Sequence, residues 1–352
     1  MHPTWSPVSR RRSIHRSEIT IDLGAVRRNT RTLLRALDGS DLWAVVKANG
    51  YGHGAVDVAA AALGSGASAV CLATVAEALE LRHEFPAEKI VVLGPAEGRD
   101  VALAREAGLE LVVSTDEIPE GVRVHLKLDT GMGRYGLGEL PEPPVEVVGL
   151  MTHLATADSD PVFARDQIAR FRTATDSHTH LTRHVANSAA ALRIPESRLD
   201  AARCGIALYG LSPFGESAEA DGLEPALHWQ SNLAQVKRLQ PGDSTGYGRR
   251  YVAEQPTWIG IVPVGYGDGF PRALSGTTVR VAGEPARVVG TVSMDSFAVE
   301  LPRELPLGAP VVIVGHGLSL EDHARHAGTI SYELATGIGT RPARARRLVV
   351  DS

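Results

Sequence analysis

A lysine set among glycines is the first group in this sequence that could do covalent chemistry. Lys47 lies in the run AVVKANGYGHG, residues 44–54, directly after an apolar stretch. Partial burial lowers the pKa of a lysine amine and makes it available for Schiff-base chemistry. The glycines that follow allow the backbone to approach a ligand closely. A lysine that extends its amine into solvent beside a glycine turn is the alternative, but the density of glycine, tyrosine and histidine favours a functional role.

Further polar residues follow other apolar runs along the chain. Arg134 lies in a glycine-rich loop, where its planar guanidinium is suited to bind a carboxylate through two hydrogen bonds. Asp129, in the same loop, is equally suited to cap a turn. His153 and Arg203 each follow an apolar run of their own. Ser188 is a candidate helix N-cap or part of an anion-binding helix N-terminus.

These groups together indicate one kind of cofactor. The backbone N–H groups of Gly205 and Ile206 are candidates for binding a phosphate, as the last loops of a barrel often do. The set therefore contains a lysine, two arginines, a histidine and an anion site, without an acidic metal-binding cluster. It suits a cofactor that carries its own phosphate and an aldehyde, and a substrate that carries a carboxylate. Pyridoxal 5′-phosphate (PLP) meets this description.

The apolar runs before these residues predict parallel strands in an α/β protein. The runs alternate with helix-like stretches, of which residues 75–84 and 99–107 are the clearest. Strands that are apolar throughout are buried on both faces. Eight such units predict a (β/α)8 TIM barrel, whose functional residues gather where the strands end; a doubly wound open sheet is the alternative. The predicted strands are residues 42–46, 69–72, 90–93, 109–113, 122–128, 145–151, 184–186 and 199–203.

A second, mostly β domain follows. Strand-like runs between glycine and proline turns occur at residues 258–264, 278–282, 286–292, 296–301 and 310–314, and a helical period returns only at residues 323–336. We therefore expect three parts with a hinge at residues 218–225. The parts are a basic N-terminal tail at residues 1–17, with its last part a candidate strand of the second domain, a barrel at residues 18–225, and a C-terminal β domain at residues 226–352.

Composition narrows the classes of protein. The chain of 352 residues has 43% hydrophobic and 22% charged residues and a net charge of −5, which indicates neither a nucleic-acid partner nor affinity for anionic membranes. The basic start is followed by no apolar run, and no stretch is long and apolar enough to span a bilayer. Cys71 and Cys204 lack the paired spacing of a zinc site or redox motif. We expect a cytoplasmic protein without a metal.

Several separated motifs, in order, resemble the alanine racemases from about residue 18 to the C-terminus. AVVKANGYGHG resembles the lysine segment of that family, and HLKLDTGMGRYG resembles its substrate-carboxylate loop. STGYGRRY resembles the segment with the catalytic tyrosine. THLATAD, ANSAA, RCGIALYG, PVGYGDGFPR, GTVSMDS and SYEL complete the pattern. One of these motifs alone is weak, whereas the ordered set is specific.

The resemblance implies an enzyme that interconverts L-alanine and D-alanine with PLP and supplies D-alanine for peptidoglycan. Lys47 would carry the cofactor covalently and act as one catalytic base, and Tyr247 would be the second base on the opposite side. Arg134, the backbone of Met294, and Tyr266 would bind the substrate or narrow its pocket. Lys127 matches a lysine that is carbamylated in some members. Residues implied in cofactor binding, besides Lys47, are Tyr51, His153, Asn187, Ser188, Arg203, Gly205, Ile206 and Tyr332.

The resemblance also implies a head-to-tail homodimer with shared active sites, because the tyrosine of the family comes from the β domain of the partner subunit. The chain departs from the common family pattern near that tyrosine. Gly246 stands where a serine is usual, Arg249 and Arg250 follow where smaller residues are common, and Thr291 replaces a frequent arginine. These differences put the breadth of substrates and the strength of the dimer in question.

Three other functions remain open at this point. A related PLP racemase could act on serine or another small amino acid, since one hydroxyl is a small difference. A barrel-type PLP decarboxylase also pairs a barrel with a β domain, but it would be expected to place an acid rather than Arg203 at the pyridine nitrogen. A non-catalytic PLP-binding protein would lack the second domain and its tyrosine.

Overall fold

The computed structural model describes residues 16–339 and 343–352, and it divides the chain into two compact units. The barrel unit consists of Thr20–Leu227, Ser319–Ile338 and Val349–Ser352. The β unit consists of His228–Leu318 and the described residues of the segments that end at Ile19 and Leu348. Most of the segment predicted as a basic tail, residues 1–15, lies outside the described residues.

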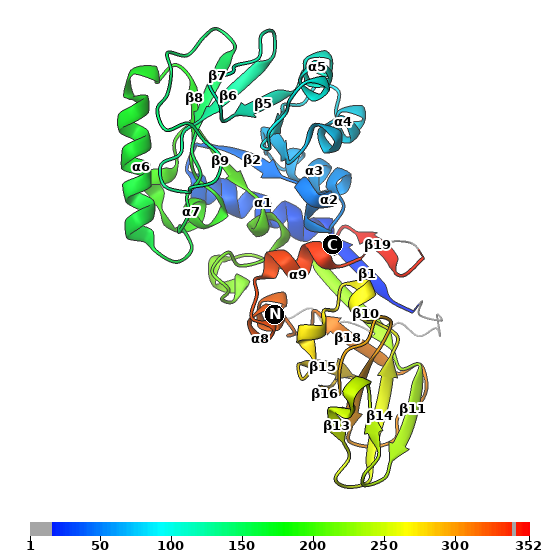
Figure 1. Cartoon of the computed structure of the whole chain (residues 1–352). Helices are drawn as coiled ribbons and strands as arrows, with labels where there is room; N and C mark the ends of the chain where they lie inside the picture. The colour runs from blue at the N-terminus through cyan, green and yellow to red at the C-terminus, as the bar shows by residue number, and fades with distance from the viewer. Residues whose placement is uncertain (1–15, 340–342) are drawn as a thin grey trace. The chain divides into compact units, whose positions relative to one another are not determined.

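The barrel unit is a closed barrel of eight parallel strands in chain order (Figure 1). This confirms the predicted TIM barrel and excludes the open sheet. The strands are β2 (Asp41–Val45), β3 (Ala69–Leu72), β4 (Ile90–Val92), β5 (Glu110–Val113), β6 (Arg123–Lys127), β7 (Val147–Met151), β8 (Thr182–His184) and β9 (Ala201–Cys204). The helices are α1 (Leu23–Leu37), α2 (Lys47–Tyr51), α3 (Ala55–Leu63), α4 (Val75–Glu84), α5 (Arg99–Glu106), α6 (Pro161–Thr175), α7 (Ser188–Arg193), α8 (Leu320–Ala327) and α9 (Ser331–Gly337).

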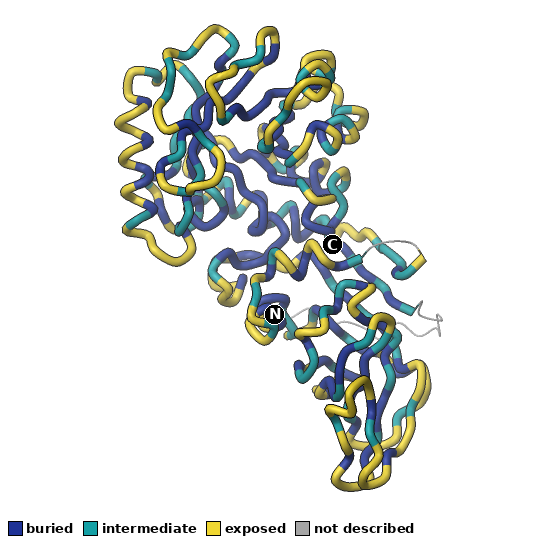
Figure 2. The backbone as a smooth tube through the Cα atoms, in the orientation of Figure 1, coloured by how far each residue is buried: buried dark blue, intermediate teal, exposed yellow. Residues whose placement is uncertain are grey.

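The barrel forms because most residues of its strands are apolar and buried. Every residue of β3, β4 and β5 is buried, and the strands of the barrel run through the buried part of the tube in Figure 2. The helices between them have local stop and start signals. Thr74 caps α4 through the N–H of Glu77, and Asp160 caps α6, whose first residue is a proline that needs no hydrogen-bond acceptor. Most barrel strands therefore end at a loop that leads into a helix, whereas β5, β6 and β7 follow one another through loops without a helix.

The β unit contains most of a nine-stranded sheet in the order β11-β14-β17-β16-β15-β18-β10-β1-β19. Its mostly β character agrees with the prediction. The strands are β1 (Glu18–Asp22), β10 (Leu227–Asn232), β11 (Gln235–Leu239), β14 (Thr257–Val262), β15 (Thr278–Val281), β16 (Glu284–Val289), β17 (Phe297–Leu301), β18 (Pro310–Val314) and β19 (Arg346–Val350). A separate hairpin pairs β12 (Ser244–Thr245) with β13 (Tyr251–Val252).

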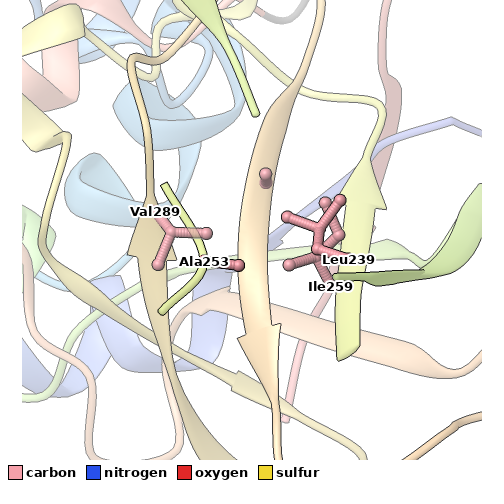
Figure 3. Close-up of a cluster of buried hydrophobic side chains, with 5 residues drawn as sticks. Leu239, Ala253, Ile259 and Val289 are labelled. Carbon is pink, nitrogen blue, oxygen red and sulfur yellow. The ribbon is translucent and has the colours of Figure 1, made fainter. Parts of the chain in front are cut away.

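A small apolar cluster anchors this hairpin to the sheet. Ala253, next to β13, packs with Leu239 of β11, Ile259 of β14, Val289 of β16 and Ala298 of β17 (Figure 3). The partly buried side chains of Tyr251 and Ile261 pack against the same cluster. The turn between β12 and β13, which contains Tyr247, is therefore attached to a well-packed base.

The chain is partitioned differently from the continuous domains expected from the sequence. The helical stretch expected at residues 323–336 consists of two helices, α8 and α9, and both belong to the barrel unit. Gly328, with φ of 70°, ends α8, because the left-handed conformation that a glycine adopts easily satisfies the last carbonyl groups of the helix. The N-terminal strand β1 lies between β10 and β19 in the large sheet. No helix within residues 16–339 and 343–352 is long and apolar enough to cross a membrane.

Candidate active site

A cavity of about 610 Å³ opens where the barrel strands end. It lies entirely within the barrel unit, and α9 contributes to its wall. The residues predicted from the sequence that line it are Lys47, Tyr51, Lys127, Arg134, His153, Asn187, Ser188, Arg203, Gly205, Ile206 and Tyr332. The parallel order of the strands explains this convergence, because their carboxyl ends meet at one end of the barrel.

The loop after β2 holds Lys47 in an unusual turn. Ala48, Asn49, Gly50 and Tyr51 all have positive φ, between 51° and 61°. Side chains disfavour this left-handed conformation, at a cost of about 1–2 kcal/mol for each residue other than glycine. Hydrogen bonds compensate within the loop, from Gly50 N to the Val46 carbonyl at 2.8 Å and from Gly52 N to the Ala48 carbonyl at 3.1 Å.

Glu77, at the start of α4, fastens this loop to the next strand end. One carboxylate oxygen accepts the N–H of Ala48 at 2.8 Å, and the other accepts the N–H of Ala73 at 2.9 Å. Burial lowers the pKa of Lys47 below its usual value, and the charge of Arg134 lowers it further, while Glu77 acts in the opposite direction. The net effect is an amine that loses its proton more easily than a surface lysine does.

Arg203, on β9, is buried and uses most of its donors inside the protein. Nη1 donates to Nδ1 of His184 at 2.7 Å and to the His184 carbonyl at 2.8 Å. Nη2 donates to the Thr152 carbonyl at 2.8 Å and lies 3.3 Å from Nδ1 of His153. In the described part of the chain no acceptor is found for Nε–H, and the residue lines the cavity. Arg203 therefore has one N–H left for a ligand.

The histidine beside Arg203 is neutral. Burial, with the charges of Arg203 and Lys127, lowers the pKa of His153 to about 3. Burial also lowers the pKa of Arg203 to about 10, so that its guanidinium stays charged at neutral pH. The pair consequently offers one fixed positive charge rather than two.

A polar recess forms another part of the cavity wall. Oγ of Ser188 accepts the N–H groups of Gly205 at 3.0 Å and Ala207 at 3.4 Å. The hydroxyl of Tyr51 lies so close to Gly205 that a Cβ there would be 2.5 Å from it. The ring of Tyr332 lies 6.2 Å from that of Tyr51. Hydroxyl groups and the first N–H groups of a helical turn at one spot can bind a phosphate.

One of the two roles considered for Ser188, that of helix cap, belongs to its neighbour Asn187. Ser188 is not the N-cap of α7, because Oδ1 of Asn187 accepts the N–H of Ala190 at 3.0 Å and so caps the helix. The hydroxyl of Ser188 is directed instead to the loop after β9. Tyr209 lies behind the recess, where it donates to the Val45 carbonyl at 2.9 Å and packs against Tyr51.

Lys127 at the end of β6 and Arg134 in the loop that follows both line the cavity. The carboxylate of Asp129 accepts the N–H groups of Gly131, Met132 and Gly133, so this residue shapes the turn, as one of the two interpretations from the sequence expected. Nζ of Lys127 lies 5.7 Å from the centre of the Tyr135 ring. Burial and the charge of Arg134 lower the pKa of Lys127 to about 8.

Three further predicted residues, Tyr247, Tyr266 and Met294, belong to the β unit and are exposed there, at 72%, 46% and 53%. Gly246 adopts φ of 78°, which disfavours the serine usual at this position, and Oγ1 of Thr291 donates to the Tyr247 carbonyl at 3.0 Å. Gly246 and Thr291, two of the residues that depart from the family pattern, therefore support the backbone at Tyr247.

The loops of Tyr266 and Met294 are fixed to each other inside the β unit. The N–H of Tyr266 donates to the Ser293 carbonyl, and the N–H of Gly267 donates to the Met294 carbonyl. Asp268, which is almost fully buried, accepts hydrogen bonds from both Arg16 and Arg344. Asp268 is therefore a structural anchor of this loop pair.

The residues that support the cavity from behind, above all Glu77, His125 and His184, were not predicted from the sequence. A usable indication was present on β6, where His125 and Lys127 alternate with the apolar Val124 and Leu126 and so share one face of the strand. Nothing in the sequence connects His125 with His184, which lies 59 residues further on. In the described part of the chain, no cluster of three or more histidine, cysteine or acidic side chains could hold a metal ion.

Comparisons with known proteins agree with this architecture. Residues 21–213 match the family model of the alanine racemase N-terminal domain, and residues 226–346 match that of the alanine racemase C-terminal domain. The chain is 40% identical to the alanine racemase of Lactiplantibacillus plantarum, covering 93% of this chain and 96% of the relative. It is also 40% identical to that of Geobacillus kaustophilus, covering 93% of each chain.

Solved structures give the same result. The alanine racemase from the D-cycloserine-producing Streptomyces lavendulae superposes with a TM-score of 0.87 at 35% identity, covering 96% of this chain and 97% of the other. The alanine racemase from E. faecalis superposes with a TM-score of 0.86 at 36% identity, covering 95% and 98% of the two chains. The chain therefore belongs to the alanine racemase family, a family of isomerases.

Proposed function

We propose that this protein is a PLP-dependent alanine racemase that uses Lys47 and Tyr247 as its two bases. The observation that carries the proposal is the partly buried amine of Lys47, whose pKa burial and Arg134 lower, in a cavity that also holds a fixed guanidinium and a polar recess. We further propose that the enzyme works in the cytoplasm and that its D-alanine is used for peptidoglycan.

The donor set of the cavity fits PLP. Nε–H is the donor of Arg203 that remains for a ligand, and it can donate to the pyridine nitrogen of PLP. A charged guanidinium can only donate, so the pyridine nitrogen that it faces must be unprotonated. Tyr51, Ser188, Gly205, Ile206 and Tyr332 would hold the phosphate, and Asn187 would support them by capping α7. When bound, PLP withdraws electrons from an amino acid and so weakens its Cα–H bond.

The chain's own residues then divide the work. The guanidinium of Arg134 would bind the carboxylate of alanine, together with the backbone of Met294, and Tyr266 would narrow the pocket. Nζ of Lys47 would exchange the Cα proton on one side of the substrate, and the hydroxyl of Tyr247 would exchange it on the other. Two bases on opposite sides avoid the large movement that a single base would need.

Lys127 is suited to carry a carbamate. A neutral amine adds CO₂ to form a carbamate and releases one proton, and a pKa of about 8 leaves a useful neutral fraction at neutral pH. The resulting negative charge would pair with Arg134, whose charge is one cause of the lowered pKa. The modification would hold Arg134 in position for the substrate.

We also propose a head-to-tail homodimer in which each active site takes Lys47 from one subunit and Tyr247 from its partner. Tyr247, Tyr266 and Met294 are largely exposed in the single chain, and large exposed side chains grouped on a surface favour an interface. A mixture of inactive subunits tests this arrangement. If Lys47→Ala and Tyr247→Phe subunits are mixed, half of the dimers are hybrids with one intact site each, so about a quarter of the wild-type activity should return.

The main experiment measures racemisation of L-alanine by purified protein with PLP, using chiral chromatography, with L-serine and L-lysine in parallel. We expect fast conversion of alanine, lost in both Lys47→Ala and Tyr247→Phe. Faster conversion of serine would support the related racemase, and release of CO₂ from lysine would support a decarboxylase. Binding of PLP to Lys47 without turnover of any amino acid would refute the racemase proposal.

A further inference from the structure

A chain of four polar side chains crosses the interior of the barrel and ends at Arg203. Glu110 on β5, His125 on β6, His184 on β8 and Arg203 on β9 are each at most 4% exposed. Nη1 of Arg203 lies 2.7 Å from Nδ1 of His184, and Nε2 of His184 lies 3.0 Å from Nδ1 of His125. Nε2 of His125 lies 2.8 Å from a carboxylate oxygen of Glu110. Barrel interiors are usually filled by branched apolar side chains, so a buried row of polar groups at this place is unusual.

The barrel is shaped to permit the contact between the two histidines. They lie on β6 and β8, and the strand between them, β7, has Gly149 at the crossing point. A Cβ at Gly149 would lie 2.1 Å from Nδ1 of His125. Trp43 on β2 packs against both imidazoles, with ring centres 5.5 Å from His125 and 4.5 Å from His184. The missing side chain provides space, and the indole restricts the rings.

Chemistry fixes the direction of each hydrogen bond. The guanidinium of Arg203 can only donate, so Nδ1 of His184 accepts and its Nε2 carries the proton. Nδ1 of His125 must then accept, and its Nε2–H donates to Glu110. Burial lowers the pKa of both His184 and His125, which agrees with two neutral rings.

The far end of the chain of polar groups carries a negative charge. Burial alone would raise the pKa of Glu110, but the hydrogen bond from His125 and the positive charges of Lys89 and Arg123 bring it below its usual value. Arg123 is 2.7 Å from the second carboxylate oxygen. An ionised carboxylate and a guanidinium thus lie at the two ends of a pair of neutral imidazoles.

We propose that Glu110 and His125 are positioning residues that act through His184 on Arg203. By accepting the Nε2–H of His184, His125 holds this ring in the tautomer that Arg203 also requires, with Glu110 orienting His125. This commits Nη1 of Arg203 to the protein and leaves Nε–H for the pyridine nitrogen of the cofactor. The inference rests on the proposed function in that it takes PLP as the ligand of Arg203. Its structural part, the pair of tautomers, does not depend on any activity.

Two measurements on the wild-type holoenzyme and its variants test the proposal. The first is ¹⁵N NMR of ¹⁵N-histidine-labelled wild-type protein, with the signals of His125 and His184 assigned through their proton contacts with the ring of Trp43. Both rings should be neutral and protonated on Nε2 alone. A cationic ring, or a proton on Nδ1 of His184, would overturn the proposal even if every variant failed to fold and even if the enzyme racemised no amino acid.

The second measurement follows the pyridine nitrogen of ¹⁵N-labelled PLP bound to Glu110→Gln. Weaker hydrogen bonding from Arg203 should move its resonance downfield, and kcat should fall about tenfold with KM changed less than about twofold. Loss of a partner behind a functional histidine has effects of at least this size in metal sites. Gly149→Ala should give the same shift, because its methyl group separates the two histidines while every charged group remains.

Glu321→Gln is the matched control. Glu321 is also 3% exposed and also accepts a buried hydrogen bond, from the N–H of Ser212, but it has no part in this chain of polar groups. We expect this variant to leave both the ¹⁵N resonance and kcat unchanged, although it also removes a buried carboxylate. An unchanged resonance and unchanged kcat in Glu110→Gln, or equal changes in Glu321→Gln, would contradict the positioning role.

Discussion

The closest approach in the proposed phosphate recess gives a quantitative prediction for Gly205→Ala. The added Cβ would lie 2.5 Å from the hydroxyl oxygen of Tyr51 and 2.9 Å from its Cζ. Ordinary contacts of this kind require 3.4 Å or more, so the tyrosine must move by about 1 Å. Tyr51 is 8% exposed, and the ring of Tyr209 lies 4.9 Å from its own. Overpacking in such a place costs about 1–3 kcal/mol.

Urea unfolding of the PLP-free protein, at one fixed protein concentration, measures this cost, and an absorbance titration with PLP measures affinity for the cofactor. Gly138→Ala is the control, because no atom lies within 4 Å of its added Cβ and the position is exposed. Adding Tyr51→Phe to Gly205→Ala removes the closest atom, so the double variant should be more stable than the sum of the single effects predicts. If Gly205→Ala matches Gly138→Ala in both stability and PLP affinity, the geometry of the recess is wrong.

Three further predictions follow from the same cavity. Glu77→Gln should lower the free energy of unfolding by about 1–3 kcal/mol, because the N–H of either Ala48 or Ala73 then faces an amide N–H instead of a carboxylate oxygen. In the same urea titration, Glu80→Gln should change this free energy little, since Glu80 is exposed. The pKa of His153 is about 3 in the folded protein, against 6.5 in the unfolded chain. Its contribution to stability is therefore complete above pH 6.5 and declines as the pH falls toward 3. The difference in unfolding free energy between wild type and His153→Gln should shrink over this window, and a constant difference would argue against the low pKa of His153. With a pKa of about 8, Lys127 should show a ¹³C carbamate signal that grows from about pH 6 to about pH 9 in ¹³C-bicarbonate and is absent in Lys127→Gln; no signal at the upper end of this range would contradict the proposed modification.

The barrel could be predicted because its strands are apolar on both faces, and β3 begins and ends at the predicted residues. The prediction was less accurate where strands serve polar surroundings. For β8, predicted at residues 184–186, the strand is Thr182–His184, because all three of its residues are polar and the apolar Val185 and Ala186 follow it. β11 was missed because four of its five residues are not buried, which removes the apolar pattern that sequence analysis detects.

The residues that line the cavity could be predicted for a related reason. A parallel barrel brings all strand ends together, so a polar residue just after an apolar run is brought to a common place whatever its distance along the chain. The buried residues that support this lining, such as His125 and His184, could not be predicted, because their contacts depend on which strands face one another inside the barrel. His125 reaches His184 only because β7 offers Gly149 between them, and a glycine in a strand indicates a bulge or a bend just as well as space for a neighbouring side chain.

The turn that carries Lys47 shows why local preference is overruled at this site. Ala48, Asn49 and Tyr51 are all left-handed, and at about 1–2 kcal/mol each their conformation would not persist in an isolated peptide. Oδ1 of Asn49 compensates by accepting the N–H of Ala55 at the start of α3, and Glu77 compensates by accepting the N–H of Ala48. A right-handed helix beginning at Lys47 would satisfy local propensity, but it would break both hydrogen bonds. The strain is therefore tied to the position of the lysine. Asn49→Gly would relax the turn, but it would also remove the hydrogen bond to the N–H of Ala55, one of the two bonds that keep the amine in the cavity.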